Sequence, residues 1–287
     1  MPATPPQTTR SLLITGCSSG IGHAAAHAMA ERGWRVFATA RKEEDVARLR
    51  EEGFEALTLD LDSSASIDAA VADVAQRTGG TLTALFNNGA YGQPGAVEDL
   101  SRDVLRQQLE TNLLGTHELT ARVLPMMRAQ GHGRIVQNSS VLGFAALPYR
   151  GAYICSKFAL EGLTDTLRQE LSGSGIHVSL IQPGPITSRF RENAHRAFRA
   201  HIDTERSAHA ETYRKLEARL ASTEGKAAFT LGPEAVVAKL IHALEHPRPR
   251  PRYAVTLPTH LFTALKRVLS TRGMDRVLLR STRDERE

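Results

Sequence analysis

The segment Thr15-Gly-Cys-Ser-Ser-Gly-Ile-Gly22 decides the fold of this 287-residue chain. It follows the apolar run Leu12 to Thr15 directly and opens the amphipathic stretch Gly20 to Arg32. A glycine-rich turn between a strand and a helix is typical of open α/β sheets, where it begins the first βαβ unit. We therefore predict a sheet of parallel strands that are connected by helices.

Short apolar runs alternate with longer amphipathic stretches along most of the chain. The other expected strands are 36–40, 56–61, 82–86, 135–137, 178–181 and 253–257. The expected helices are 20–32, 42–51, 64–77, 103–128, 150–171 and 233–244. Continuous apolar runs are typical of strands that are covered on both faces, and helical crossovers between parallel strands are right-handed. The sequence thus predicts a Rossmann-type, doubly wound α/β fold with a seven-stranded parallel sheet in a three-layer α/β/α sandwich.

One catalytic domain accounts for residues 10–258 of this pattern. We expect residues 1–9 to be a disordered N-terminal segment and residues 259–287 to be a basic helical extension. Residues from about 187 to 230 are rich in Arg, His, Ala and Glu and interrupt the strand–helix alternation. Long insertions after a strand's carboxyl end often cover a site, so we predict a helical substrate lid there.

The composition excludes several classes of protein. With 41% hydrophobic and 23% charged residues, the chain is globular rather than disordered or fibrous. No run of about 18 apolar residues is present, which argues against a membrane-spanning helix. Residues 1–10 have no apolar signal region, so we expect a cytoplasmic location. Two cysteines, Cys17 and Cys155, are too few for a disulfide framework and lack metal-ligand spacing, so we expect no metal site. We expect both to be small buried side chains, and the alternative is that oxidation of their thiols tunes activity.

Positive charge is concentrated near the C-terminus. Residues 247–283 hold nine Lys and Arg against one acid, Asp275, whereas residues 1–246 hold 26 basic and 27 acidic side chains. No nucleic-acid-binding motif accompanies this charge, so we expect no nucleic-acid partner. Two interpretations of the basic tail stay open. It forms a solvated helix face, or residues 257–280 form an amphipathic helix that contacts an anionic membrane surface peripherally.

The glycine-rich turn is suited to a dinucleotide. Backbone amides and a helix N-terminus point at a bound phosphate in such a turn. Gly16 allows the tight turn, Gly20 the close approach of the pyrophosphate, and Gly22 the packing of helix on strand. The alternative is a flexible connection with no ligand. The strand before the turn and the helix after it favour the dinucleotide.

The residue that follows the second strand indicates which dinucleotide binds. An acid there would bind the ribose 2′-hydroxyl of NAD(H), whereas a cation accommodates the 2′-phosphate of NADP(H). The chain reads Ala38-Thr-Ala-Arg-Lys42, so Arg41 favours NADP(H). The alternative for Arg41 and Lys42 is a solvated helix start. Asp60 follows the third strand and is a candidate partner of the adenine, although Asp60 or Asp62 could simply cap the next helix.

Tyr153 and Lys157 form a candidate proton-transfer pair. Four residues apart in a predicted helix, they project from one face. Carbonyl reduction by hydride leaves an alkoxide that needs a proton, and a nearby ammonium lowers the pKa of a phenol. Ser140 ends the fifth strand, where its hydroxyl would orient a substrate carbonyl. The alternatives are a surface helix pair for Tyr153 and Lys157, and Ser139 in place of Ser140.

These motifs together resemble the short-chain dehydrogenase/reductase family, strongly over residues 10–190. The matching residues are Thr15 to Gly22, Asn87-Asn-Gly-Ala90, Asn112, Ser140, Tyr153, Lys157 and Pro183-Gly-Pro-Ile-Thr-Ser188. Two positions depart from the family pattern. Asn-Asn-Ala-Gly is usual where this chain has Asn87 to Ala90, and Thr is usual at Ser188.

The resemblance implies a role for each matching residue. Tyr153 is the catalytic acid/base, Lys157 lowers its pKa and binds the nicotinamide ribose, Ser140 orients the substrate, and Asn112 holds a water of the proton relay. The cofactor-binding residues implied by the turn and the resemblance are Gly16, Ser18, Ser19, Gly20, Ile21, Gly22, Arg41, Asp60, Leu61, Asn87, Tyr153, Lys157, Pro183, Ile186 and Ser188.

Three segments resemble the branch that includes 17β-hydroxysteroid and retinol dehydrogenases and bacterial aldehyde reductases: Ala38 to Arg41, Tyr153 to Leu160, and the basic C-terminal extension. This implies an apolar substrate, and the candidate substrate-binding residues are Leu142, Phe144, Leu147, Tyr149 and Phe190, with a plain core role as the alternative. The family also implies a homodimer or homotetramer built through the helices that carry Asn112 and Tyr153.

We therefore predict an NADP(H)-dependent oxidoreductase that interconverts a carbonyl and an alcohol on an apolar aldehyde, ketone or steroid-like or retinoid-like compound. One alternative is a dinucleotide-binding regulator without turnover. A second is a sugar-nucleotide epimerase or dehydratase.

Overall fold

The computed structural model describes residues 10–221 and 229–282. The predicted N-terminal segment 1–9, the part of the predicted lid at 222–228 and the last five residues, 283–287, lie outside the described residues. Within the described ranges, no helix is both long and apolar enough to cross a membrane.

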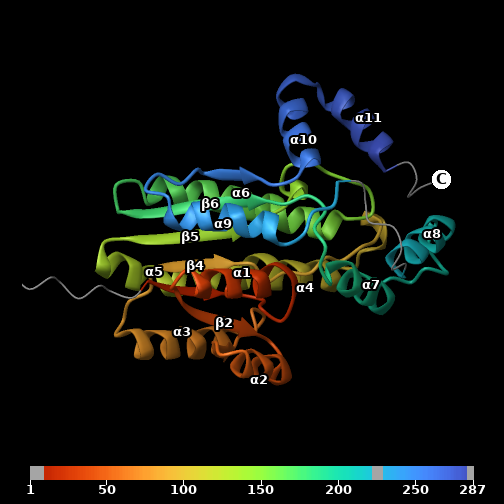
Figure 1. Cartoon of the computed structure of the whole chain (residues 1–287). Helices are drawn as coiled ribbons and strands as arrows, with labels where there is room; N and C mark the ends of the chain where they lie inside the picture. The colour runs from red at the N-terminus through yellow and green to blue at the C-terminus, as the bar shows by residue number, and fades with distance from the viewer. Residues whose placement is uncertain (1–9, 222–228, 283–287) are drawn as a thin grey trace, which may run out of the picture.

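A single sheet of seven parallel strands forms the centre of the molecule, in the order β3-β2-β1-β4-β5-β6-β7 (Figure 1). This order reverses direction between β1 and β4, as expected for a doubly wound fold, and the predicted fold class is confirmed. The strands are β1 (Ser11–Ile14), β2 (Arg35–Ala40), β3 (Glu55–Thr58), β4 (Ala84–Asn87), β5 (Gly133–Asn138), β6 (Ile176–Gln182) and β7 (Arg252–Ala254).

Helices cover both faces of the sheet and make it the middle of three layers. The helices on one face are α1 (Gly20–Glu31), α2 (Glu43–Glu51) and α9 (Glu234–Glu245). Those on the other face are α3 (Ser64–Thr78), α5 (Thr116–Gln130) and α6 (Gly151–Glu170). Since each strand alternates its side chains, Leu12 packs with the first group and Leu13 with the second.

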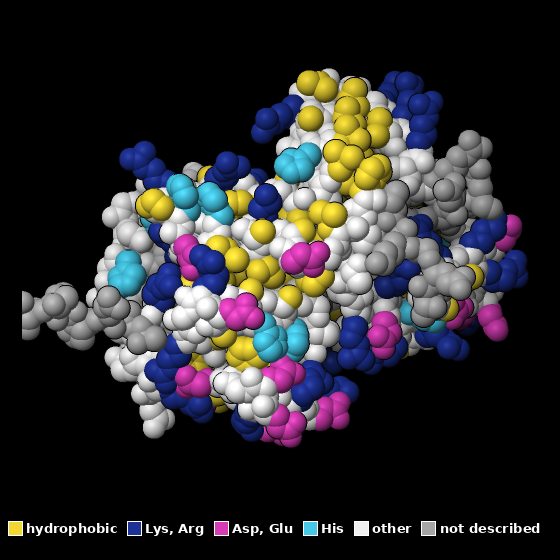
Figure 2. Space-filling view, viewed as in Figure 1, with side chains coloured by type: hydrophobic (Ala, Val, Ile, Leu, Met, Phe, Trp, Pro, Cys, Tyr) yellow, Lys and Arg dark blue, Asp and Glu magenta, His cyan; other side chains and the backbone are white. Residues whose placement is uncertain are grey.

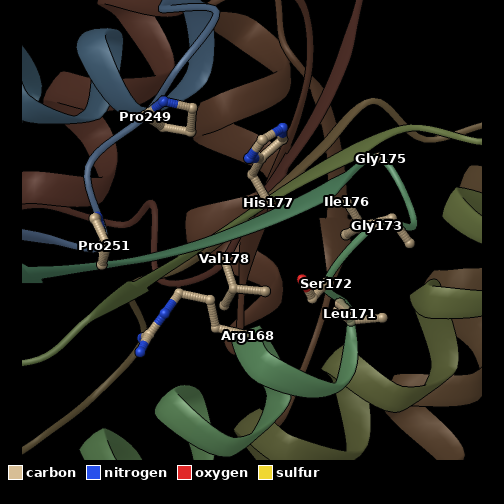
Figure 3. A pocket seen from close by; sticks show the side chains of 10 residues that line it. All are labelled: Arg168, Leu171, Ser172, Gly173, Gly175, Ile176, His177, Val178, Pro249 and Pro251. Carbon is tan, nitrogen blue, oxygen red and sulfur yellow. The ribbon is translucent and has the colours of Figure 1, made fainter.

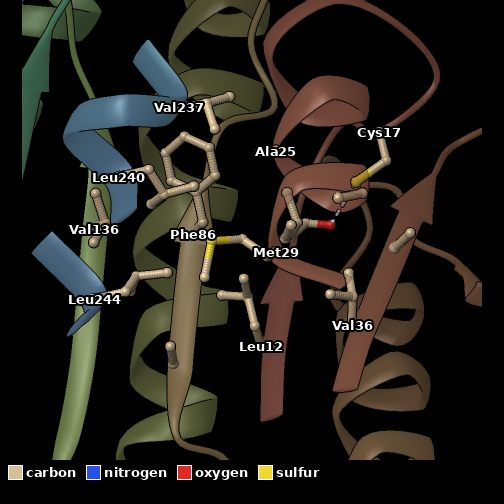
Figure 4. Close-up of a cluster of buried hydrophobic side chains, with 14 of the residues drawn as sticks. Leu12, Cys17, Ala25, Met29, Val36, Phe86, Val136, Val237, Leu240 and Leu244 are labelled. Atoms are coloured by element: carbon tan, nitrogen blue, oxygen red, sulfur yellow. Dashed lines mark hydrogen bonds between the residues drawn. The ribbon is translucent and has the colours of Figure 1, made fainter. Parts of the chain in front are cut away.

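Two buried clusters hold the layers together. Figure 4 shows the first, in which Leu12 and Phe86 of the sheet face Met29 of α1 and Leu240 of α9. Each of these four side chains is fully buried. Burial of a side chain of this size stabilises the fold by about 1.5–3 kcal/mol. The sheet is therefore a rigid base for the loops at its carboxyl edge.

Two pairs of helices lie outside the three layers. The predicted lid contains α7 (Phe190–His201) and α8 (Ala210–Ala221), which pack on each other through Phe198 and Tyr213. The predicted C-terminal extension is a helical hairpin of α10 (Leu257–Val268) and α11 (Thr271–Ser281) that projects from the body in Figure 1. Both segments are helical, as predicted.

The long helix expected over 103–128 is interrupted. It consists of α4 (Arg102–Leu109), a π-helical turn η2 (Glu110–Gly115) and α5. A Cβ atom on Gly115 would lie 1.9 Å from the carbonyl oxygen of Leu61, so only glycine allows this approach. Strand β3 ends at Thr58, three residues earlier than predicted, and a turn then leads to Leu61. In this turn the Asp60 carboxylate accepts a hydrogen bond from the Asp62 amide.

Candidate active site

The glycine turn joins β1 to α1 at the carboxyl edge of the sheet. Gly16 and Gly20 have φ values of +71° and +59°, which favour glycine. A Cβ atom on Gly22 would lie 2.2 Å from the carbonyl oxygen of Gly16. The turn thus has the tight geometry expected of a phosphate cradle. Ser18, Ser19 and Ile21 are partly exposed on it.

Asn88 holds the glycine turn in place. Its side-chain amide donates hydrogen bonds to the carbonyl oxygens of Thr15 (3.0 Å) and Gly16 (3.3 Å). In return, the Thr15 hydroxyl accepts hydrogen bonds from the amides of Asn88 (2.8 Å) and Gly89 (2.7 Å). Thr15 and Asn88 were not among the predicted site residues. The adjacent asparagines of the Asn87–Ala90 motif were the signal that could have found Asn88.

The side chain of Asn87 points elsewhere. It is buried and donates a 2.9 Å hydrogen bond to the hydroxyl of Thr120 on α5. Successive residues of a strand point to opposite faces, so Asn88, rather than Asn87, directs its side chain at the glycine turn. Asn87 lies at the carboxyl end of β4, but its side chain points at α5 and not at the glycine turn.

A cleft beside the turn encloses about 360 Å³. Arg41 follows β2 directly, is exposed at the cleft wall and has no ion pair among the described side chains. Lys42 instead pairs with Glu44 at 3.0 Å. Asp60 and Leu61 line the same cleft. The structure therefore brings these predicted cofactor-binding residues together with Arg41 and Gly16.

The lid also contributes to this cleft, which the sequence did not indicate. Asn193, Arg196 and His201 of α7 line it together with Tyr91 of the β4–α4 connection. The pKa of Tyr91 is raised to about 12, mainly by burial and also by the Asp62 carboxylate, while Arg41 opposes both effects. The lid thus reaches the nucleotide side of the cleft.

Tyr153 and Lys157 lie on the inner side of α6. The Lys157 ammonium is 5.7 Å from the centre of the Tyr153 ring and donates a 2.7 Å hydrogen bond to the carbonyl oxygen of Asn138. Lys157 is almost fully buried. The Ser140 hydroxyl is close enough to the Tyr153 phenol to lower its pKa. Three predicted catalytic residues therefore meet at the carboxyl end of β5.

Ser140, rather than Ser139, faces this site. Ser140 is the N-cap of the short helical turn η3 (Val141–Gly143), and its hydroxyl accepts a 3.1 Å hydrogen bond from the Leu142 amide. The Ser139 hydroxyl is buried, and a Cβ atom on Gly143 would lie 2.5 Å from it. Ser139 therefore belongs to the interior.

The electrostatics of the pair differ from our expectation. Burial raises the pKa of Tyr153 to about 12, and the Ser140 hydrogen bond opposes that shift. Burial likewise lowers the pKa of Lys157 to about 8, although Glu161 opposes this. This direction differs from the expected lowering of the phenol pKa, because desolvation of the buried phenol outweighs the contribution of Ser140.

Asn112 lies in the π-helical turn η2. Its side chain is buried, donates a 2.8 Å hydrogen bond to the Tyr91 carbonyl and accepts a 3.2 Å hydrogen bond from the Tyr91 amide. It also donates to the Ser156 hydroxyl at 3.2 Å, which links η2 to α6. π-Helical turns occur frequently at functional sites. Ser156, the neighbour of Lys157, was not among the predicted site residues.

The segment after β6 lies over the glycine turn. Pro183 accepts a 2.7 Å backbone hydrogen bond from Val141, and Ile186 pairs with Leu231 in an isolated bridge. The Ser188 side chain lies 3.1 Å from the position that a Cβ atom on Gly20 would take. The predicted cofactor-binding residues Pro183, Ile186 and Ser188 thus connect η3 to the turn.

The five candidate pocket residues separate into three environments. Phe190 lies edge-on to the Tyr153 ring. Leu142, Phe144 and Leu147 pack against the C-terminal hairpin. Tyr149 packs on Tyr213 and His209 near α8. The core role that we left as an alternative therefore applies to four of them, and Phe190 is the one that contacts the candidate acid/base.

The two cysteines differ. Cys17 is buried in the glycine turn, and burial raises the pKa of its thiol to about 12. Cys155 is exposed, so the expectation that it is buried is wrong. At 100° per residue, position 155 lies across the helix from the inward-facing Tyr153 and Lys157.

Two further features lie away from this site. Figure 3 shows a hollow at the amino-terminal end of β6, lined by His177, Arg168 and Pro251, among other residues. Active sites of open α/β sheets lie at the opposite, carboxyl edge. On the outside of α1, the Nε2 atoms of His23 and His27 lie 2.7 and 3.0 Å from a carboxylate oxygen of Glu52.

Comparison with known proteins identifies the family. The short chain dehydrogenase family matches residues 10–198. The chain belongs to this family. It is an oxidoreductase, and its resemblance to short-chain dehydrogenases is confirmed.

Three relatives of this short-chain dehydrogenase are informative. The present chain is 44% identical over 270 residues to the uncharacterized oxidoreductase YbbO of Escherichia coli strain K12, and the match covers 94% of both chains. It is 34% identical over 260 residues to human 17-beta-hydroxysteroid dehydrogenase type 1, covering 85% of this chain and 77% of that protein. Among solved structures, a variant of actinorhodin polyketide ketoreductase with NADPH is 29% identical, with a TM-score of 0.70 and coverage of 86% and 95%.

Proposed function

We propose that this enzyme interconverts a carbonyl and an alcohol on an apolar aldehyde, ketone or steroid-like or retinoid-like compound, with NADP(H) as its cofactor. The observation that carries the proposal is the meeting of Tyr153, Ser140 and Lys157 at the carboxyl end of β5, beside the glycine turn. This set provides a proton donor, a hydrogen-bond donor for an oxygen atom, and a cation.

The residues around the turn fit a dinucleotide. The space above Gly22 admits no side chain, and the positive φ of Gly16 and Gly20 bends the backbone so that a phosphate can approach closely. When bound, NADP(H) supplies or accepts the hydride. The turn would hold the pyrophosphate, Asp60 and Leu61 the adenosine side, and Ile186 and Ser188 the nicotinamide side.

Each catalytic residue has one task at a stated atom. The Ser140 hydroxyl donates a hydrogen bond to the substrate oxygen and orients it. The Tyr153 hydroxyl donates its proton to that oxygen during reduction and takes it back during oxidation. The Lys157 ammonium, held by the Asn138 carbonyl, stabilises the phenolate that remains. Asn112 holds the water molecule that returns a proton, and its contacts with Tyr91 fix its side chain.

Arg41 selects NADP(H). It is the cation that follows β2, it lies at the cleft wall and it has no acidic partner among the described residues. An unpaired guanidinium suits the two negative charges of a 2′-phosphate. The ketoreductase described above, which was solved with NADPH, also supports this cofactor.

The substrate side is apolar. Phe190 covers Tyr153 with an aromatic ring. The likeness to a 17-beta-hydroxysteroid dehydrogenase supports an apolar substrate. We also propose a homodimer or homotetramer through η2 and α6, where Leu114 and Leu163 are 48% and 45% exposed.

The test is NADPH oxidation, followed by absorbance, with a panel of apolar aldehydes and ketones. We expect turnover by the wild type and a loss of about 10²–10⁴-fold in kcat for Tyr153→Phe, with NADPH binding kept. Turnover that survives in Tyr153→Phe would contradict the assignment of the acid/base. NADPH binding without turnover of any compound would favour the dinucleotide-binding regulator instead.

A further inference from the structure

The C-terminal hairpin of α10 and α11 exposes an apolar stripe to solvent. Leu257, Leu261 and Val268 of α10 are 59%, 50% and 77% exposed. Their spacing, with Ala264 between them, places these side chains on one face of the helix. An amphipathic helix usually buries its apolar face, but here the buried positions of α10 are Thr259 and Phe262. The apolar stripe is therefore available to a partner.

Positive charge surrounds this stripe. Residues 257–282 contain five basic residues and one acid, Asp275. The basic residues are Lys266, Arg267, Arg272, Arg276 and Arg280. Arg272 and Arg276 are exposed and lie one turn apart on α11. Leu279, which is 40% exposed, lies in the following turn between Arg276 and Arg280. Figure 2 shows the apolar patch of the hairpin at the top of the view, with Lys and Arg side chains on both sides.

The hairpin is fixed to the candidate active site. Phe262, Met274 and Leu278 on its inner side pack with Val141 and Ala145, which follow Ser140 in the chain. Lys266 donates a 2.7 Å hydrogen bond to the Phe144 carbonyl. At the other end of α10, the Thr256 hydroxyl lies 2.1 Å from the position that a Cβ atom on Gly184 would take. The exposed stripe is thus one layer away from the loops that contribute Ser140 and Pro183.

We propose that this hairpin docks the enzyme on an anionic lipid bilayer, with the apolar stripe of α10 inserted at the headgroup level and the arginines of α11 on lipid phosphates. An apolar face with flanking cations is the pattern of helices that lie in the membrane interface. Each Lys or Arg near an anionic surface contributes about fivefold to binding.

The charge of the hairpin disfavours a second copy as its occupant. A two-fold contact places the same patch against itself. Five cations and one acid on each side would then repel one another across the contact. An anionic bilayer instead complements both the charge and the apolar stripe. The docking does not depend on the proposed reaction, because its readout needs neither substrate nor turnover.

The experiment is co-sedimentation of the full-length enzyme with vesicles of phosphatidylcholine alone or mixed with phosphatidylglycerol. We expect binding to the anionic vesicles that weakens severalfold between about 0.05 and 0.5 M salt, since salt screens exposed charges. Arg272→Glu with Arg276→Glu should reduce binding to the anionic vesicles by at least about 25-fold. Leu257→Ser with Leu261→Ser and Val268→Ser should reduce binding at both salt concentrations.

The control is Val97→Ser, which removes a 73% exposed apolar side chain far along the chain from the hairpin and should leave vesicle binding unchanged. Circular dichroism and NADPH binding check that all variants fold. Absence of binding to anionic vesicles at low salt, or binding that both hairpin variants retain, would overturn the proposal. Sedimentation equilibrium would also overturn it under two conditions. The wild type would form an assembly that does not bind vesicles, and the serine variant would have half the mass of that assembly.

Discussion

The Phe190 ring lies edge-on to the Tyr153 ring, with their centroids 5.3 Å apart and their planes at 66°. Phe190 is the first residue of α7, and a Cβ atom on Gly92 would lie 2.6 Å from its ring. The lid therefore contacts the candidate acid/base directly and packs against the loop after β4. This cover is one reason that burial raises the pKa of the phenol.

Phe190→Ala should open this cover. We expect the KM for an apolar substrate to rise about 2- to 10-fold, since the variant loses an aromatic contact of about 0.5–1.5 kcal/mol, while Tyr153 itself stays in place. The pKa of Tyr153 should fall towards its ordinary value as water reaches the phenol. Steady-state kinetics and the pH dependence of kcat check both. Phe229→Ala removes another exposed phenylalanine, 59% exposed, and should change neither quantity.

Gly22→Ala should disrupt the glycine turn. The added methyl group would lie 2.2 Å from the Gly16 carbonyl oxygen, a backbone atom that cannot move without distorting the turn. We expect NADPH affinity to fall more than about 10-fold and the melting temperature to fall, as measured by NADPH fluorescence titration and thermal unfolding. The matched control is Gly162→Ala, at an exposed position of α6 with no atom within 4 Å, which should stabilise the fold by about 0.5–1 kcal/mol. Equal effects of the two substitutions would contradict the role of the turn.

Arg41→Ala should change the choice of dinucleotide. Loss of a charge-assisted contact of about 1.5–3 kcal/mol weakens NADPH binding by roughly 10- to 100-fold. NADH lacks the 2′-phosphate, so its affinity should stay nearly constant. Lys42→Ala is the control, because Lys42 already pairs with Glu44. The idea fails if both dinucleotides weaken equally in Arg41→Ala, or if the Lys42 variant has the same effect.

Lys157→Met should alter the pH dependence of stability. The pKa of Lys157 is lowered from 10.5 to about 8 in the folded protein, so between these values the unfolded chain binds more protons and wild-type stability rises with pH. Below about pH 8 the ammonium is buried at full cost. We therefore expect any advantage of Lys157→Met in melting temperature to be largest near about pH 7 and to shrink towards about pH 10, while turnover is lost. A constant difference across that range would show that the pKa of Lys157 is not lowered by burial.

Much of the fold could be predicted because local signals agreed with one another. The strand, glycine turn and helix around Gly16 fixed the first βαβ unit, and continuous apolar runs marked strands buried on both faces. The sequence could not indicate which of two adjacent polar residues faces the site. For the pairs Asn87/Asn88 and Ser139/Ser140, the choice depends on the residue at which the strand ends. A shift of that end by one residue exchanges the directions of the two side chains.

The pocket was predicted less well for a different reason. Leu142, Phe144 and Leu147 were candidate substrate-binding residues with a plain core role as the alternative, and they pack on a hairpin that lies far later in the chain. The roles of Asn193, Arg196 and His201 also depend on how the lid folds back over the sheet. Periodicity describes elements one at a time, whereas these contacts arise between distant elements.

The π-helical turn that carries Asn112 holds one more residue than a regular helical turn would need. Deleting a single residue within Glu110–Gly115 would restore an unbroken helix and leave the following side chains of α5 nearly in place, because the π-helical turn holds its extra residue as a bulge. The change would fall on Asn112, which lies inside the bulge and owes to it the direction of its amide towards Tyr91. A shorter chain in this turn would thus be more regular, but it would lose the side chain that we propose holds the water molecule.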